Sequence, residues 1–144
     1  MTALDWVRNR VDPSTATALV LAGDLLAISV FVVMGEISHD YPLLSVRVLG
    51  TYAQFVIGWL VVALPAGVYA TDYRRDLTRS TGLVLAAWLG ADMVAQGLRS
   101  TAFFPGNAAL TFGIVAFLVG GVLLLAWRLT FAFVTSRQQS TVPA

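Results

Sequence analysis

The sequence predicts an all-α membrane protein, an up-down bundle of four transmembrane helices with both termini in the cytoplasm. Hydrophobic residues make up 58% of the 144 residues and charged residues only 12%, whereas a soluble domain carries about a quarter charged residues. Four apolar stretches are each long enough to cross a hydrocarbon core of about 30 Å. The connections between them are short, which makes successive helices antiparallel neighbours. We therefore expect one integral membrane domain over residues 1–144.

The expected elements follow one another with little sequence between them. Residues 1–14 form a short polar tail, in which Trp6, Arg8 and Arg10 are typical of a segment lying at the membrane interface. The four spans are expected at about residues 15–36, 50–70, 80–100 and 108–134, and a second short polar tail follows them. The last span exceeds the roughly 20 residues that a bilayer requires, so we expect it to tilt or to extend into the cytoplasm.

Arginine supplies all nine basic residues, and its distribution predicts the orientation. Seven arginines lie in the tails, in the middle connection or near the inner end of the last span, and two lie on the opposite side. The positive-inside rule places the richer side in the cytoplasm. The richer side carries Arg8, Arg10, Arg74, Arg75, Arg79, Arg128 and Arg137, and the poorer side carries Arg47 and Arg99.

A polar stripe runs along the third expected span. Its members are spaced at i, i+4, i+8 and i+11, which is one face of a helix: Trp88, Asp92, Gln96 and Arg99. Ionisable groups exposed to lipid are costly, so the other helices are expected to cover this face. At about 1.5 Å of rise per residue, Asp24 on the first span lies at a depth similar to that of Asp92. Gln54 on the second span lies level with Gln96 by the same measure. We therefore expect an intramembrane polar column of Asp24, Gln54, Trp88, Asp92, Gln96 and Arg99.

Two interpretations of the carboxyls in this column remain open. In the first they are structural, because a neutral Asp can hydrogen-bond a neighbouring helix and Arg99 can pair with Asp92 along their shared helix. If the last span continues to Val134, Arg128 also comes within reach of Asp24. In the second, Asp24 and Asp92 form a pair that binds a substrate or exchanges protons, because ionisable residues inside membranes are often functional.

The connection after the first span is expected to form an outer mouth with Glu36, His39, Asp40 and Arg47. Glu36 and His39 are three residues apart, which is half of a carboxylate-bridged metal motif. The chain contains one His and no Cys, so the second half is missing and we expect no metal and no cofactor. A solvated or ion-paired mouth is the favoured interpretation, in which His39 titrates near neutral pH and senses external acidity.

The inner end of the last span carries Trp127 and Arg128, an aromatic and basic pair typical of an anchor at the inner interface. The same span contains two pairs of small residues at a spacing that allows helices to approach closely: Ala109 with Gly113, and Ala116 with Gly120. Pro65 and Gly67 are expected to kink the inner end of the second span.

Short motifs are distributed over about residues 23–129: Asp24, the segment 35–40, Gly58 with Trp59, Trp88, Arg99, and Trp127 with Arg128. With these motifs the chain resembles an uncharacterised family of small four-span membrane proteins known from halophilic archaea and actinobacteria, one of the domains of unknown function. The resemblance implies a four-span membrane fold. It implies no activity and no substrate.

Three functions are compatible with these features. The first is a small proton- or ion-coupled transporter in which Asp24 and Asp92 form the functional carboxylate pair. The alternative is a non-catalytic membrane module that stabilises or regulates a larger complex. An integral membrane enzyme acting on a lipid or quinone, with Glu36, His39, Asp40 and Arg99 near the outer surface, ranks last because the chain has no Cys and no second His. The chain also contains no nucleophile elbow and no P-loop. A net charge of +1 provides no basic field for nucleic acid, so the expected partners are the lipid bilayer and a second copy of the chain or another membrane protein.

Overall fold

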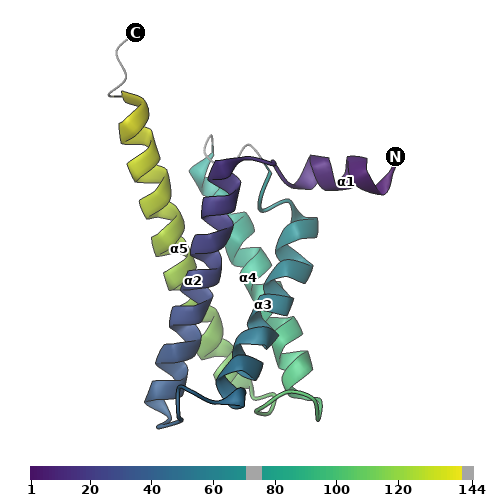
Figure 1. Ribbon diagram of the computed structural model, residues 1–144, viewed down its shortest axis with the longest axis vertical. Helices are drawn as coiled ribbons and strands as arrows, with labels where there is room; N and C mark the ends of the chain where they lie inside the picture. Colours follow the sequence, from purple (N-terminus) through teal and green to yellow (C-terminus); the bar gives the residue numbers. More distant parts are fainter. Residues whose placement is uncertain (71–75, 141–144) are drawn as a thin grey trace.

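Residues 1–70 and 76–140, which the computed structural model describes, form five α-helices (Figure 1). These residues contain no β-strand, only an isolated bridge between Val11 and Tyr69. Four of the helices, α2 to α5, are long and apolar enough to cross a membrane. The helices are α1 (Ala3–Arg10), α2 (Thr15–Ser38), α3 (Val46–Ala66), α4 (Leu77–Arg99) and α5 (Leu110–Ser140). The expected all-helical class with four apolar helices is confirmed.

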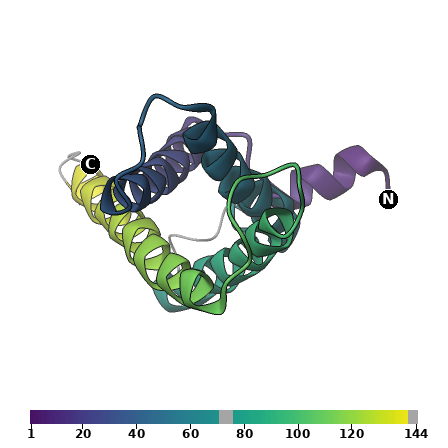
Figure 2. The same ribbon diagram turned by 90° about the horizontal axis from the view of Figure 1, so that it is seen from below.

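The four long helices pack side by side in a closed ring, as the view along their length shows (Figure 2). Contacts join α2 to α3, α3 to α4, α4 to α5 and α5 back to α2, and the contact between α3 and α4 is the most extensive. The short helix α1 projects sideways from one end of this ring and contacts α3 (Figures 1 and 2). The C-terminal part of α5 extends beyond the other helices at that same end (Figure 1).

Three of the long helices begin at polar side chains that cap their first turns. Ser14 accepts a hydrogen bond from the backbone N–H of Thr17 at 3.2 Å and starts α2. Ser45 and Asp76 do the same for α3 and α4, with N–H donors at 3.4 Å and 2.9 Å. Such caps satisfy donors that have no partner inside the helix. The cap at Ser45 explains why α3 begins four residues before the expected start at residue 50.

Helix α3 ends at Ala66, four residues before the expected end at residue 70. Gly67 adopts a left-handed conformation with φ of 75° and donates its N–H back to the last turn, which is the usual way for glycine to end a helix. The next two residues, Val68 and Tyr69, turn back under the ring and are only 2% exposed. A hydrogen bond of 2.9 Å from the Asp12 N–H to the Tyr69 carbonyl holds this segment in place. The early end of α3 therefore brings Tyr69 into the interior.

The core is built around aromatic rings from three helices. Trp88 is fully buried, and its ring centroid lies 5.7 Å from that of Phe55 and 6.2 Å from that of Trp59. Its indole N–H donates to the Ala116 carbonyl of α5 at 3.1 Å. Helix α5 can approach this closely because a Cβ atom at Gly120 would lie 2.2 Å from the Trp88 ring. The small residues of α5 thus serve packing between α4 and α5 of this chain.

Candidate functional site

Asp24 lies at the centre of a buried cluster near the end of the molecule that carries α1. Its carboxylate accepts two hydrogen bonds from Arg128 on α5, from Nε at 2.9 Å to Oδ1 and from Nη2 at 2.5 Å to Oδ2. The Tyr69 hydroxyl donates to Oδ2 at 2.5 Å, and the Trp59 indole N–H donates in turn to the Tyr69 oxygen at 2.7 Å. We call these four residues the Asp24 cluster. Asp24 is 0% exposed and Arg128 is 9% exposed.

The Asp24 cluster is electrically neutral and supports a structural role for Asp24. A buried carboxylate is stable only when paired and hydrogen-bonded, and here three donors from outside its own helix meet both oxygens. Burial, together with the Asp24 carboxylate, raises the pKa of the Tyr69 hydroxyl, so Tyr69 stays protonated and remains a donor. The contact of Arg128 with Asp24 was expected if the last span continued to Val134, and α5 continues beyond it to Ser140.

The expected inner anchor of Trp127 and Arg128 has a different role in the structure. Arg128 is a member of the buried Asp24 cluster instead of lying at an interface, because α5 continues for three more turns beyond it. Trp127 donates its indole N–H to the Val20 carbonyl at 3.2 Å. Its ring covers Gly23, where a Cβ atom would lie 1.8 Å away. Both residues therefore join α5 to α2.

Arg99 is held by the connection that follows α4, and not by Asp92. Its Nε donates to the Asn107 carbonyl at 3.2 Å and its guanidinium lies over the Phe112 ring, 3.9 Å from the centroid. Its Nη1 lies 3.4 Å from the Gln54 side-chain oxygen. Gln54 in turn donates to the Pro105 carbonyl at 2.8 Å. Arg99 and Gln54, both expected in the polar column, thus fasten the connection between α4 and α5 onto α3.

The expected outer mouth divides into an ion pair between buried Glu36 and partly exposed Arg47, and an exposed turn. Glu36, 5% exposed, accepts from the Thr51 hydroxyl at 3.0 Å and lies 3.4 Å from Nε of Arg47. His39 and Asp40 are exposed at the end of α2, and Asp40 has a φ of 57° in the turn. Within residues 1–70 and 76–140, no three His, Asp or Glu side chains are grouped so as to hold a metal ion. A pH-sensing role for His39 stays a prediction.

Asp92 has a quite different environment from Asp24. It lies in a groove between α4 and α5 with a volume of about 440 Å³, which we call the Asp92 groove. Its Oδ1 accepts from the Gln96 amide nitrogen at 3.0 Å, one turn along the same helix. Its Oδ2 receives no hydrogen bond from the described residues and lies opposite Gly113, 3.7 Å from the position of a Cβ there. The remaining lining is almost entirely apolar: Leu89, Met93, Ala108, Ala109, Leu110, Ile114, Phe117 and Leu118.

Gln96 is one of the residues that line this groove, and its side-chain oxygen is buried without a hydrogen-bond partner. Native proteins leave few buried polar atoms unsatisfied, and each such atom calls for an explanation. The groove therefore holds two acceptors with unused capacity, Asp92 Oδ2 and Gln96 Oε1, at the base of an apolar wall. Several wall residues are about half exposed on the outside of the ring, among them Leu89 at 47% and Ile114 at 51%.

The expected polar column is thus divided among separate sets of partners. Asp24 and Asp92 do not share a site, because Asp24 bonds to α5 and Tyr69 while Asp92 bonds to Gln96. The two glutamines do not bond to each other either. Trp88 belongs to the aromatic core. Sequence reasoning missed Tyr69 as the partner of Asp24, although the Gly67 that ends α3 was a signal that the chain turns back there.

A family model matches residues 21–131 of the chain, and its description reads "Protein of unknown function (DUF3054)". The match covers all of α3 and α4 and most of α2 and α5, so it includes both the Asp24 cluster and the Asp92 groove. No curated protein and no solved structure matches the chain.

Proposed function

The chain belongs to the DUF3054 family, whose description names no activity, and we propose a function from the geometry of the chain itself. The protein is a small proton-coupled carrier of lipophilic organic cations, and Asp92 is the carboxyl that exchanges a proton for the cation. The observation that carries this proposal is the Asp92 groove, an apolar groove with a carboxylate oxygen and an amide oxygen without partners at its base.

The shape and composition of the groove favour a ligand of drug-like size. Small-molecule sites commonly occupy about 300–1,000 Å³ and are mostly apolar with a few placed polar groups. The groove falls in this range at about 440 Å³. It opens on the outside of the helix ring, between side chains such as Met93, which is 68% exposed. A lipophilic molecule can therefore enter it sideways from the acyl chains of a bilayer.

The polar groups of the groove select a cationic hydrogen-bond donor. Asp92 and Gln96 have two oxygens without hydrogen-bond partners among the described residues, which matches a protonated amine with an apolar body. The segment that lines the groove opposite Asp92, residues 108–118 at the start of α5 and just before it, contains no titratable residue. The nearest cation along α4 is Arg99, whose hydrogen bonds go to Asn107 and Gln54. No described cation forms an ion pair with Asp92, so a bound cation or a proton is the proposed source of its counter-charge.

Coupling to protons follows from the same requirement for charge balance. An ionised carboxylate facing lipid is costly unless a counter-charge accompanies it. In the groove either the organic cation or a proton supplies that charge, so the two compete for Asp92. Release of one on binding of the other is the elementary step of exchange.

We place the carrier in the cell membrane as an up-down four-span bundle with both termini cytoplasmic. Support comes from the ring of helix contacts and from the position of α1 at the same end as the last turns of α5 (Figure 1). Arginine also supports it: with the buried Arg99 and Arg128 set aside, six arginines remain on the inner side against Arg47 on the outer side. Two of the six, Arg74 and Arg75, lie outside the described residues.

The alternative, a non-catalytic module for a larger complex, has less support from the geometry. Its expected sign was a lipid-facing surface of small residues on the last span. Ala116 and Gly120 are instead buried against Trp88 within the chain, and Gly113 faces Asp92. Homo-oligomerisation stays a prediction.

The test measures binding and proton release with a fluorescent aminoacridine as the lipophilic cation. Purified protein in detergent is titrated with the dye while a pH indicator reports released protons. We expect wild-type protein to bind and to release protons, and Asp92→Asn to bind at least about tenfold more weakly because it loses a charge-assisted contact. Glu36→Gln, which removes another buried carboxylate outside the groove, is the matched control and is expected to bind normally.

A second variant separates the groove from the charge. Gly113→Leu keeps Asp92 but fills the groove, so it is expected to weaken dye binding and to block dye-driven proton flux in proteoliposomes. Wild-type protein that binds no dye, or Asp92→Asn that binds and releases protons like wild type, would overturn the proposal.

A further inference from the structure

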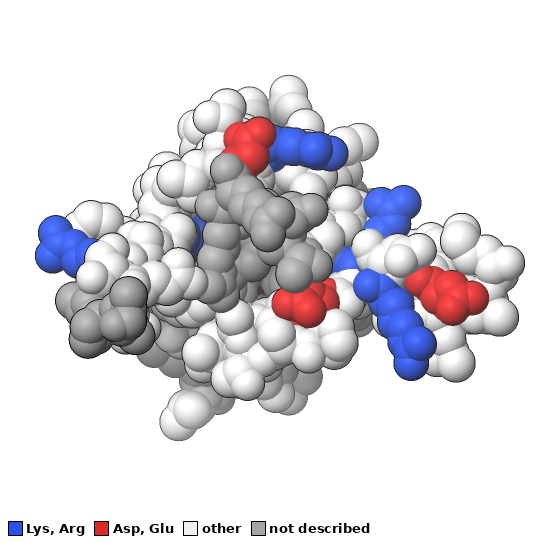
Figure 3. Space-filling view, turned by 90° about the horizontal axis from the view of Figure 1, so that it is seen from above, with Lys and Arg blue, Asp and Glu red and all other residues white. Residues whose placement is uncertain are grey.

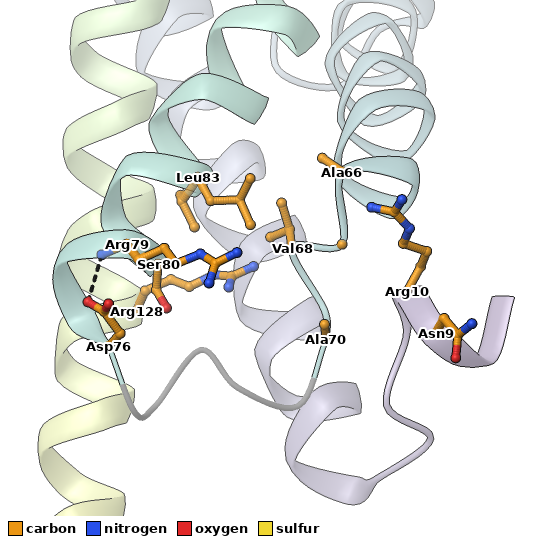
Figure 4. A pocket seen from close by; sticks show the side chains of 12 residues that line it. Asn9, Arg10, Ala66, Val68, Ala70, Asp76, Arg79, Ser80, Leu83 and Arg128 are labelled. Atoms are coloured by element: carbon orange, nitrogen blue, oxygen red, sulfur yellow. Dashed lines mark hydrogen bonds between the residues drawn. The ribbon is translucent and has the colours of Figure 1, made fainter. Parts of the chain in front are cut away.

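A second pocket lies at the end of the molecule that carries α1, and Arg128 is one of the residues that line it. Its volume is about 290 Å³. Its walls come from the end of α1, the segment 66–70 after α3, and the first two turns of α4, and Arg128 of α5 completes it (Figure 4). Four parts of the chain that are distant in sequence thus converge here.

Three of the described residues that line this pocket are arginines. In Figure 4 the guanidinium groups of Arg79 and Arg128 extend from α4 and α5 toward Val68, and Arg10 approaches from the opposite wall. Among the described residues of the lining one is acidic, Asp76, and its Oδ1 already accepts the Arg79 backbone N–H as the cap of α4. Figure 3 shows that arginine side chains are distributed widely over this face of the molecule, including over α1. The pocket is therefore basic.

Arg128 provides the decisive observation. Its Nε and Nη2 are used by Asp24, but its Nη1 is buried and has no hydrogen-bond partner. Arg128 is more than nine-tenths buried and lines the pocket. A guanidinium carries donors on all three nitrogens, and leaving a buried one unmet is unfavourable. An acceptor oxygen placed in the pocket would satisfy it.

We propose that this pocket binds a phosphate oxyanion, with Arg128 Nη1 and the Arg79 guanidinium as its donors and Arg10 as a third cation. Arginine forks match the oxygens of a phosphate in geometry as well as charge. The N-terminal end of α4 borders the pocket and adds the positive end of its helix dipole. The same chemistry is offered by free phosphate and by the headgroup of an anionic phospholipid, and basic pockets between membrane helices are known lipid sites.

Binding at this site would act on the stability of the whole helix ring. Arg128 would hold the phosphate with one nitrogen while the other two hold Asp24 on α2, so the anion would complete a bridge between α1, α2, α4 and α5. A ligand that binds only the folded state raises the unfolding temperature. The Asp92 groove lies elsewhere along α4 and α5, so the two sites are independent.

The experiment measures thermal unfolding of the full chain in a zwitterionic detergent. One arm adds inorganic phosphate against sodium chloride of equal ionic strength, and the other adds short-chain phosphatidylglycerol against phosphatidylcholine. Protection by phosphate identifies a soluble anion as the ligand, and protection by phosphatidylglycerol alone identifies a lipid headgroup. We expect one of these two results.

Variants then locate the effect without disturbing the Asp24 cluster. Arg79→Gln is expected to raise the ligand concentration needed for half of the protection about tenfold, because it removes a charge-assisted donor. Arg8→Gln, which removes an exposed arginine of α1 that does not line the pocket, is the matched control and should respond like wild type. Protection by neither ligand overturns the proposal, and so does equal protection of wild type and Arg79→Gln.

Discussion

Asp24 and Asp92 are the same residue type on two membrane-length helices, yet their hydrogen-bond partners differ. Asp24 is 0% exposed and receives three hydrogen bonds from Arg128 and Tyr69. Asp92 is 4% exposed and receives one, from its own helix. Burial is nearly equal, so burial does not distinguish them. The number of donors from other parts of the chain does.

This difference separates a structural carboxylate from one that is available for a ligand. Both oxygens of Asp24 are engaged, and any ligand would first have to displace Arg128 or Tyr69. Asp92 has an unused oxygen beside an unused amide oxygen of Gln96, in a groove of about 440 Å³. A carboxylate inside a membrane is therefore best judged by its tertiary partners.

Removing the charge of Asp24 should have the largest effect. Asp24→Asn leaves the Arg128 cation buried without its counter-charge, so we expect a loss of about 3–5 kcal/mol in the free energy of unfolding. Reversible unfolding in mixed micelles measures it. The double variant Asp24→Leu with Arg128→Leu removes both charges and should recover most of the loss. An Asp24→Asn protein that is as stable as wild type would mean that the Asp24 cluster contributes nothing to stability.

Two glycines of α5 allow the packed core and the Asp92 groove to be compared by adding a methyl group to each. Gly120→Ala places a Cβ 2.2 Å from the Trp88 ring in the packed core, so we expect a loss of about 1–3 kcal/mol. Gly113→Ala faces the Asp92 groove, where the nearest atom is 3.7 Å away, and should change stability by less than about 0.5 kcal/mol. The same unfolding assay compares them. Equal losses would show that the groove is packed as tightly as the core.

The outer ion pair should have an intermediate to small effect. Glu36→Gln removes the charge that faces Arg47, whose side chain is 35% exposed, but keeps an acceptor for the Thr51 hydroxyl. We expect a loss of about 0.2–1 kcal/mol, because solvent screens a half-exposed pair. Unfolding at low and high salt should show the difference from wild type shrinking as salt rises. A loss as large as that of Asp24→Asn would show that the Glu36–Arg47 pair contributes as much to stability as the buried Asp24–Arg128 pair.

Neutralising Asp92 should have the smallest effect on stability. Asp92→Asn retains an oxygen that can accept from Gln96, and no cation is left unpaired, so we expect a change within about 0.5 kcal/mol. The unfolding assay used for Asp24→Asn measures it under the same conditions. A loss of several kcal/mol would reveal a structural role for Asp92 and would remove the contrast on which the proposed carrier function rests.

The helices of the fold could be predicted from the sequence alone. Long apolar stretches separated by polar residues are sufficient to predict four membrane-length helices, because crossing a bilayer requires that length and composition. The sequence also identified which polar residues lie inside the spans. Helix ends were less well predicted, as at Ser45 and Gly67, because a single cap or a left-handed glycine decides an end that hydrophobicity alone does not mark.

Which polar groups contact one another depends on the tertiary structure. Depth along a helix can be counted from the sequence, but the direction in which each side chain points around the ring depends on how the helices rotate and pack. Asp24 and Asp92 were expected at similar depths, and the packing gave Asp24 the partners Arg128 and Tyr69 and gave Asp92 an open groove. Tyr69 reaches Asp24 only because the chain turns back after Gly67. The ion pairs between these helices therefore depend on how the ring packs, and they cannot be predicted from any single helix.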